Sequence, residues 1–232
     1  MFPYSDSLSG QKGFYGVTWL ILAMSAFYIA MSYSETLNEW SIVHLSFVPI
    51  YFSLSPWAHL HTLVSSTFLH ADIFHILGNC LFLWVFGRSL EHLFGLPIFL
   101  ALFPFLGATG LLLHWVINPD SGSPVIGASG AIATLMGAYL TLFPNARMKM
   151  ILVLGIFFKR FTVPAWTFLF YWVGLQLLSM VFGSDSDNHD NVAYAVHVGG
   201  FMVGVLSAMI WKVSYPFAEE HLSEFTESAF KP

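Results

Sequence analysis

The sequence has 232 residues, of which 56% are hydrophobic and only 9% are charged, and its formal net charge is −5. Soluble domains usually carry about a quarter charged residues, so a surface this poor in charge predicts an integral membrane protein. The eight Lys and Arg residues form no basic stripe, which argues against a nucleic-acid partner. The single cysteine, Cys80, excludes an internal disulfide and a cysteine-based metal site.

Apolar runs along the chain predict the elements of the fold. A helix of roughly 17–25 apolar residues is long enough to cross a bilayer. We expect six such helices in an all-α, polytopic bundle, with approximate bounds 14–33, 74–93, 97–117, 127–144, 163–182 and 192–211.

The segments outside these helices are short, with two exceptions. Residues 34–73 form a long connector rich in Trp, Phe, Leu and His, and residues 145–162 contain MILVLGIFF. That run is too short to span a bilayer, so we expect it at the membrane interface. The six-span domain covers 14–213 and lies between an N-terminal tail, 1–13, and a C-terminal tail, 214–232. The second tail is expected to be either a short amphipathic helix or a frayed terminus.

All basic residues fall on one side of this predicted topology. They are Lys12, Arg88, Arg147, Lys149, Lys159, Arg160, Lys212 and Lys231. The positive-inside rule makes that side cytoplasmic, so both tails are expected to be cytoplasmic. The connectors on the other side carry only acidic residues: Glu35, Glu39, Asp72, Asp120, Asp185, Asp187 and Asp190.

Polar side chains inside a span are costly and mark functional sites. In the outer halves of the spans they are His75, Asn79, Ser129 and His197. His75 and Asn79 are four residues apart, so they share one helix face. At 1.5 Å per residue, Ser129 and His197 lie about 27 and 22 Å above the basic residues that follow their spans. We therefore expect them at similar depth, where they could form a hydrogen-bonded pair.

Glycines make a meeting of the fourth and sixth spans plausible. Gly137, Gly200 and Gly204 provide small residues that let two backbones approach closely. A meeting of these spans would place His197 next to Ser129. A serine hydroxyl is a poor nucleophile without an adjacent base of this kind, and free amides in a first helical turn could stabilise an oxyanion. Each feature also has a plainer interpretation. The sequence GASG (127–130) could serve packing or N-capping, His75 with Asn79 could bridge helices, and His197 could be a satisfied buried histidine.

Three motifs together resemble those of the rhomboid intramembrane serine proteases. They are HILGN (75–79), GASG (127–130) and HVGGFMVG (197–204), and the resemblance extends over about residues 55–212. It implies an endopeptidase that cuts membrane proteins in or near a transmembrane helix and needs no cofactor or metal.

The resemblance also implies roles for individual residues. Ser129 would be the nucleophile and His197 the general base of a dyad. The oxyanion and substrate would be bound by His75, Asn79 and the turn at Gly127, Ala128 and Gly130. Glu91 matches an acidic position with a structural role, and the fifth span, with Trp166, Phe170 and Trp172, matches the proposed entrance for substrates. The resemblance further leads us to expect a bacterial inner membrane, with the active site opening to the outer side.

The sequence departs from the family pattern at several positions. His61 and Thr62 stand where many members have a Trp-Arg pair in the first connector. Ala133 stands where some members have a tyrosine that packs on the catalytic histidine, and Val196 replaces a frequent alanine. The first connector and the packing around His197 are therefore expected to differ.

Other classes of protein fit less well. A membrane-embedded zinc protease would need HExxH, which is absent, and NPDSG (118–122) is better interpreted as a turn. The acidic run 185–190 could hold a cation, although a solvated connector explains it more simply. A rhomboid-like pseudoprotease that binds transmembrane helices without cutting them is the main alternative. A small transporter is disfavoured because neither internal repeats nor mid-membrane charges occur.

Overall fold

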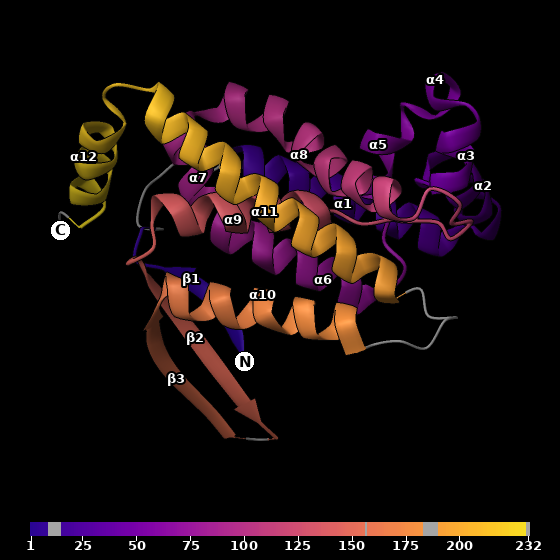
Figure 1. Ribbon diagram of the computed structural model, residues 1–232. Coiled ribbons are helices and arrows are strands. Elements are labelled where there is room, and N and C mark those ends of the chain that lie inside the picture. The colour runs from indigo at the N-terminus through magenta and orange to yellow at the C-terminus, as the bar shows by residue number, and fades with distance from the viewer. Residues whose placement is uncertain (9–14, 156, 183–189, 231–232) are drawn as a thin grey trace.

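The computed structural model describes residues 1–8, 15–155, 157–182 and 190–230, and it is mostly helical (Figure 1). In this part of the chain, five helical segments are long and apolar enough to cross a membrane. They are α1 (Tyr15–Tyr33), Ile73–Phe94, α8 (Leu96–Ile117), α10 (Ala165–Phe182) and Tyr194–Ser214 within α11 (Asp190–Ser214). The prediction of a helical, polytopic membrane bundle is confirmed.

The segment Ile73–Phe94 is not one regular helix. It consists of α6 (Ile73–Phe82), a π-helical stretch η2 (Leu83–Gly87) and α7 (Arg88–Phe94). The carboxylate of Glu91 in α7 accepts hydrogen bonds from the amides of Gly16 (2.7 Å) and Val17 (2.8 Å). These amides belong to the first turn of α1 and have no partner within that helix. Glu91 therefore fastens the start of α1 to the second span.

The fourth predicted span is a shorter helix, α9 (Ser129–Leu142), which lies in the middle of the bundle (Figure 1). It has 14 residues, and ten of them are buried. The predicted 27 Å between Ser129 and Arg147 assumed one continuous helix. Because α9 ends at Leu142, the rise along it is only about 20 Å.

Helix α9 packs closely against α11 through glycines. A Cβ atom at Gly200 would lie 2.6 Å from the carbonyl oxygen of Gly130. A Cβ atom at Gly137 would collide with the carbonyl of Phe201, and one at Gly204 with the carbonyl of Thr134. Larger residues would force the two helices apart, so these glycines set the distance between their backbones.

The first connector folds into short helices at one end of the bundle (Figure 1). These are α2 (Glu35–Leu45), α3 (Pro49–Leu54), α4 (Pro56–His59), α5 (Thr62–Ser65) and the 3-10 turn η1 (Ser66–Phe68).

This connector is fastened to the segment that leads into α9. Phe47 and Val125 exchange two backbone hydrogen bonds, of 3.1 and 2.7 Å, and both side chains are buried in a small apolar cluster. The departures at His61 and Thr62 have local partners instead of a Trp-Arg pair. The His61 ring bonds to the carbonyl of His44 (2.9 Å), and the Thr62 hydroxyl donates to the carbonyl of His59 (2.7 Å).

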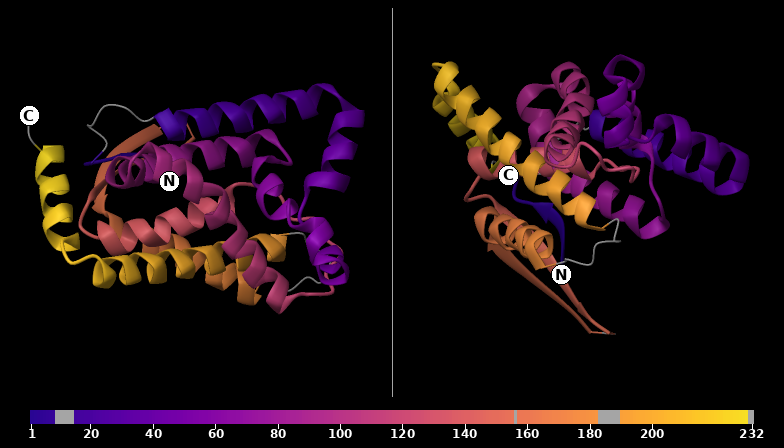
Figure 2. Two further views of the ribbon diagram at one scale, coloured as in Figure 1. Left: turned by 90° about the horizontal axis from the view of Figure 1, so that it is seen from above. Right: turned by 45° about the vertical axis from the view of Figure 1, so that its right-hand side comes forward.

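A three-stranded antiparallel sheet is the element that sequence analysis did not predict. It has the order β1 (Phe2–Asp6), β2 (Arg147–Leu154) and β3 (Phe157–Pro164). Met148 and Met150 of β2 are buried, whereas Arg147 and Lys149 are exposed, as expected for alternating strand residues. The far end of the β2–β3 hairpin extends away from the helices (Figure 2, right).

Both predicted tails contain regular structure. In β1, the buried carboxylate of Asp6 accepts hydrogen bonds from the Ser89 hydroxyl (2.8 Å) and from the Tyr139 hydroxyl. The C-terminal tail forms α12 (Ala218–Phe230), so the helical alternative for it is confirmed. Its Phe225 ring packs on Phe143 at the end of α9, with ring centroids 5.3 Å apart. The domain bounds themselves stay a prediction.

Candidate active site

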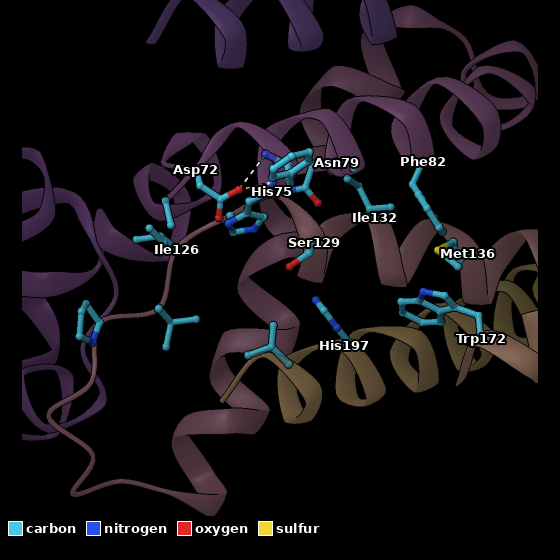
Figure 3. A pocket seen from close by; sticks show the side chains of 17 residues that line it. Asp72, His75, Asn79, Phe82, Ile126, Ser129, Ile132, Met136, Trp172 and His197 are labelled. Atoms are coloured by element: carbon cyan, nitrogen blue, oxygen red, sulfur yellow. Dashed lines mark hydrogen bonds between the residues drawn. The ribbon is translucent and has the colours of Figure 1, made fainter. Parts of the chain in front are cut away.

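A cavity of about 680 Å³ lies between α6, α9, α10, α11 and the loop before α9 (Figure 3). Its lining includes four polar residues that sequence analysis singled out, namely His75, Asn79, Ser129 and His197. The structure thus brings together side chains from three helices that are up to 122 positions apart in the sequence, from 75 to 197.

Ser129 is the first residue of α9, and Ala128 before it has no side chain that could cap the helix. The amides in the first turn of α9 therefore remain available to a ligand in the cavity. Gly127 precedes this start with a φ of +116°, and its amide donates a hydrogen bond to the carbonyl of Ser66 (2.9 Å). The sequence GASG thus builds a tight turn that presents Ser129 at the cavity, and Ser129 is not itself the N-cap.

His75 and Asn79 converge on this turn from α6. A Cβ atom at Gly127 would lie 2.6 Å from Nε2 of His75 and 3.6 Å from Nδ2 of Asn79. Only glycine accommodates both the positive φ and this close approach. The Asn79 side chain is 6% exposed, and its Nδ2 group has no hydrogen-bond partner in the described part of the chain. It is an unused donor beside the serine.

Asp72 fixes the start of the helix that carries His75. Its Oδ1 atom accepts hydrogen bonds from the amides of Phe74 (2.7 Å) and His75 (3.0 Å). The hydrogen bond from the His75 amide, followed by that from Phe74, stabilises the carboxylate and lowers the pKa of Asp72. The orientation of His75 therefore begins with an N-cap outside the span.

The ring of His197 is held from α10. Its Nδ1 atom lies 2.8 Å from Oε1 of Gln176, and its ring centroid lies 5.7 Å from that of Trp172. Its Nε2 atom has no hydrogen-bond partner among the described residues, and the ring points toward Ser129 (Figure 3). A direct hydrogen bond between Ser129 and His197 is not formed. Catalytic hydrogen bonds are often long without substrate and shorten when it binds.

Two residues close to this cavity were not predicted from the sequence. Gln176 is an uncharged polar residue inside an apolar span, which is itself a signal of function. His70 is 2% exposed, and its ring lies 5.1 Å from that of His75. Burial, together with the neighbouring His75, lowers the pKa of His70 to about 4. Its position just before the second span gave no signal beyond its residue type.

The remaining predicted site residues contribute backbone or packing. Ala128 is completely buried, and a Cβ atom at Gly130 would lie 2.8 Å from Cγ1 of Val196. Gly137, Gly200 and Gly204 lie farther along the α9–α11 contact, away from the cavity.

The alternative of a cation site finds no ligand set in the described ranges. Within them, no group of three or more His, Cys, Asp or Glu side chains could hold a metal ion. Most of the acidic run 185–190, including Asp185 and Asp187, lies outside the described residues.

The fold and the cavity define a class of protein: a polytopic membrane bundle in which a serine at a helix start faces a histidine on another helix. A model of the rhomboid domain matches residues 57–213. The chain therefore belongs to the rhomboid family.

Curated relatives agree with this assignment. The human presenilin-associated rhomboid-like protein, mitochondrial, is 30% identical over 169 residues, which cover 71% of this chain and 41% of the relative. Rhomboid protein 1, mitochondrial, of Saccharomyces cerevisiae is 30% identical over 159 residues, covering 66% of this chain and 42% of the relative. RHOMBOID-like protein 12, mitochondrial, of Arabidopsis thaliana is 30% identical over 165 residues. The chain thus spans about two fifths of the length of these relatives.

These relatives overturn one expectation. A bacterial inner membrane was expected, but the similar curated proteins are mitochondrial rhomboids, so that expectation is wrong. It rested on the resemblance to the family, and membership of a family does not fix the membrane in which a member resides. The multi-pass membrane character is unaffected.

Proposed function

We propose that this chain is an intramembrane serine endopeptidase that hydrolyses peptide bonds in or near transmembrane segments of other membrane proteins. The observation that carries the proposal is the meeting of Ser129 and His197 in one cavity. Beside the serine lies Nδ2 of Asn79, which has no hydrogen-bond partner among the described residues. The family assignment supports the same class of activity.

The first step is attack of the Ser129 hydroxyl oxygen on the scissile carbonyl carbon. The serine proton passes to Nε2 of His197, the ring nitrogen without a hydrogen-bond partner in the described part of the chain. Because Nε2 must be unprotonated to accept it, the proton of the neutral ring has to be on Nδ1. The Gln176 carbonyl, 2.8 Å from Nδ1, is an acceptor for that proton.

The negative charge that develops on the carbonyl oxygen needs hydrogen-bond donors. Nδ2 of Asn79, the His75 ring and the amide of Ser129 surround the turn at Gly127. These groups are fixed by α6 and α9 before the reaction, so they need little reorganisation as charge develops. The positive end of the α9 dipole adds to the stabilisation.

Collapse of the tetrahedral intermediate breaks the C–N bond, and His197 gives its proton to the leaving amine. A water molecule then attacks the acyl-serine ester, with His197 as the base, and the acid product is released. The cavity is lined by the loop residues Pro124 and Val125 and by Ala71 before α6, so water reaches it from the end of the bundle that carries the first connector.

The substrates that fit this site are membrane proteins, since α6, α10 and α11 beside the cavity belong to segments long and apolar enough to span a bilayer. A peptide bond must leave its helix to enter the cavity, so segments with small or helix-breaking residues are preferred. No metal or other cofactor takes part in these steps.

The test is cleavage of a panel of single-span reporter proteins in membranes that contain the full chain. We expect wild-type cleavage to fall to background in Ser129→Ala and in His197→Ala, a loss of at least about 10³-fold. Ser121→Ala and His44→Ala are matched controls, since both residues lie away from the cavity lining, and they should cut normally.

Labelling with a fluorophosphonate separates the alternatives. An active serine protease should be labelled at Ser129, and the label should disappear in Ser129→Ala. A folded wild-type chain that binds reporter helices but neither cuts them nor takes the label would instead be a pseudoprotease.

A further inference from the structure

The ring of His197 has a polar partner on a helix that contributes neither Ser129 nor the oxyanion donors. Nδ1 of His197 lies 2.8 Å from Oε1 of Gln176 in α10, and it is the only ring nitrogen of His197 with a hydrogen bond among the described residues. We infer that Gln176 is a positioning residue for the catalytic base, and this inference rests on the proposed function. It fixes the proton on Nδ1 and turns Nε2 toward Ser129.

The chemistry of the amide supports this assignment. A carbonyl oxygen can only accept, so the proton of the hydrogen bond must come from Nδ1 of the imidazole. A neutral ring with its proton on Nδ1 has its lone pair on Nε2, the atom that faces the serine. In a catalytic triad a carboxylate orients the histidine. In a dyad without a carboxylate, a neutral amide can orient the ring without adding a charge inside the membrane.

A second contact from the same helix holds the plane of the ring. Trp172 lies one helical turn before Gln176, so both side chains project from one face of α10. Its ring centroid lies 5.7 Å from that of His197, with an angle of 41° between the planes. Ala133 on α9 is too small to provide such a contact. Trp172 and Gln176 together therefore restrain the ring that α9 leaves unsupported.

The two halves of α10 differ in how deeply they are buried in the bundle. The buried residues of α10 are Ala165, Phe168 and Leu169, all in its first five positions. From Phe170 onward the helix reaches the bundle only through partly buried residues, Trp172 and Gln176 among them. Outward tilting of this half of α10 would remove both contacts from the base, so His197 is correctly oriented only while α10 lies against α11.

The experiment measures the rate of fluorophosphonate labelling at Ser129 and reporter cleavage between pH 5 and 9, using the full chain in bilayers. Gln176→Met keeps the size of the side chain but removes the acceptor. We expect labelling to slow by about tenfold, the upper end for a neutral hydrogen bond. Leu178→Ala, which removes a 55% exposed side chain from the same half of α10, is the matched control and should label normally.

Gln176→Glu distinguishes positioning from packing. A carboxylate still accepts the Nδ1 proton, so labelling at high pH should recover to within a few-fold of wild type. It also stabilises the imidazolium, so the acid limb of the pH–rate profile should move to higher pH. A purely structural glutamine would produce no such shift.

The outcomes are distinct. If wild type is labelled and cuts, but Gln176→Met keeps the normal rate or Gln176→Glu keeps the normal pH profile, the inference is overturned and the proposed function stands. If folded wild type neither labels nor cuts, both are overturned. Thermal unfolding of each variant in detergent verifies that the comparison is made between folded proteins.

Discussion

The two neighbours of α11 in the candidate site contact it in opposite ways. Helix α9 touches it backbone to backbone, with no room for a Cβ atom at Gly137, Gly200 or Gly204. Helix α10 contacts it through the side chains of Trp172 and Gln176, and a Cβ atom at its Gly174 would meet nothing within 4 Å. The close contact fixes where the backbones of Ser129 and His197 lie, whereas the loose contact fixes how the His197 ring is turned.

The largest effect is expected from an extra methyl group in the close contact. Gly204→Ala places a carbon against the carbonyl of Thr134, and the helix backbones must separate to admit it. We expect the free energy of unfolding to fall by roughly 3 kcal/mol, the upper part of the range for overpacking. Thermal or denaturant unfolding in detergent measures this loss.

The control is an added methyl group in α10, whose contact with α11 is less close. Gly174→Ala meets open space and replaces glycine within a helix, so stability should stay the same or rise by up to about 1 kcal/mol. Equal losses in the two variants would show that α9 and α10 pack against α11 equally closely.

A smaller effect is expected in the first half of α10, where its buried residues lie. The ring of Phe168 lies 6.1 Å from those of Phe82 and Phe86 and is nearly parallel to the second. Phe168→Leu keeps most of the buried apolar volume but removes both aromatic pairs, which together contribute about 2 kcal/mol. We expect faster proteolysis within α10 than in wild type. Phe170→Leu, which removes a 59% exposed ring two residues away, should leave the rate unchanged.

The smallest effect concerns the segment that supports the serine turn. His70 has a pKa of about 4 when folded and near 6.5 when unfolded, so between these values the unfolded chain binds a proton that the native chain does not. Stability is therefore lost as pH falls from about 6.5 toward 4, with a loss of about 1 kcal/mol by pH 5.5.

The measurement for His70 is denaturant unfolding at pH 7.5 and 5.5. His70→Asn should remove this part of the pH dependence, whatever its effect on stability at pH 7.5. An unchanged pH dependence in that variant would show that another group is responsible. His70 would then not contribute to the pH dependence of the free energy of unfolding.

Most of the helical fold could be predicted because a bilayer sets the length of apolar runs. The predicted start of each span lies within a few residues of an observed helix start, as at Ile73 and Ala165. The sheet could not be predicted in this way. Its strand Phe2–Asp6 pairs with residues about 145 positions later, and the apolar run in 147–154 is compatible with helix, strand or interface.

The candidate site was predictable to the extent that it depends on local motifs. The sequence GASG placed Ser129 at a helix start, and the spacing of His75 and Asn79 placed both on one face. The partner of His197 was not predictable by the same means, since Gln176 lies 21 residues away on another helix. Only the rotation of α10 about its own axis decides whether a polar residue at 176 faces the bundle or the lipid.

The buried carboxylate of Asp6 has a consequence for the biogenesis of the chain. Its two hydroxyl partners, Ser89 and Tyr139, lie 83 and 133 positions later. During synthesis Asp6 is made before both of its partners, and Tyr139 is not available to it until α9 has been inserted. The amino-terminal strand can therefore complete its contacts only after the first four predicted spans have been inserted. Docking of this strand then depends on the correct placement of α9, the helix that carries Ser129.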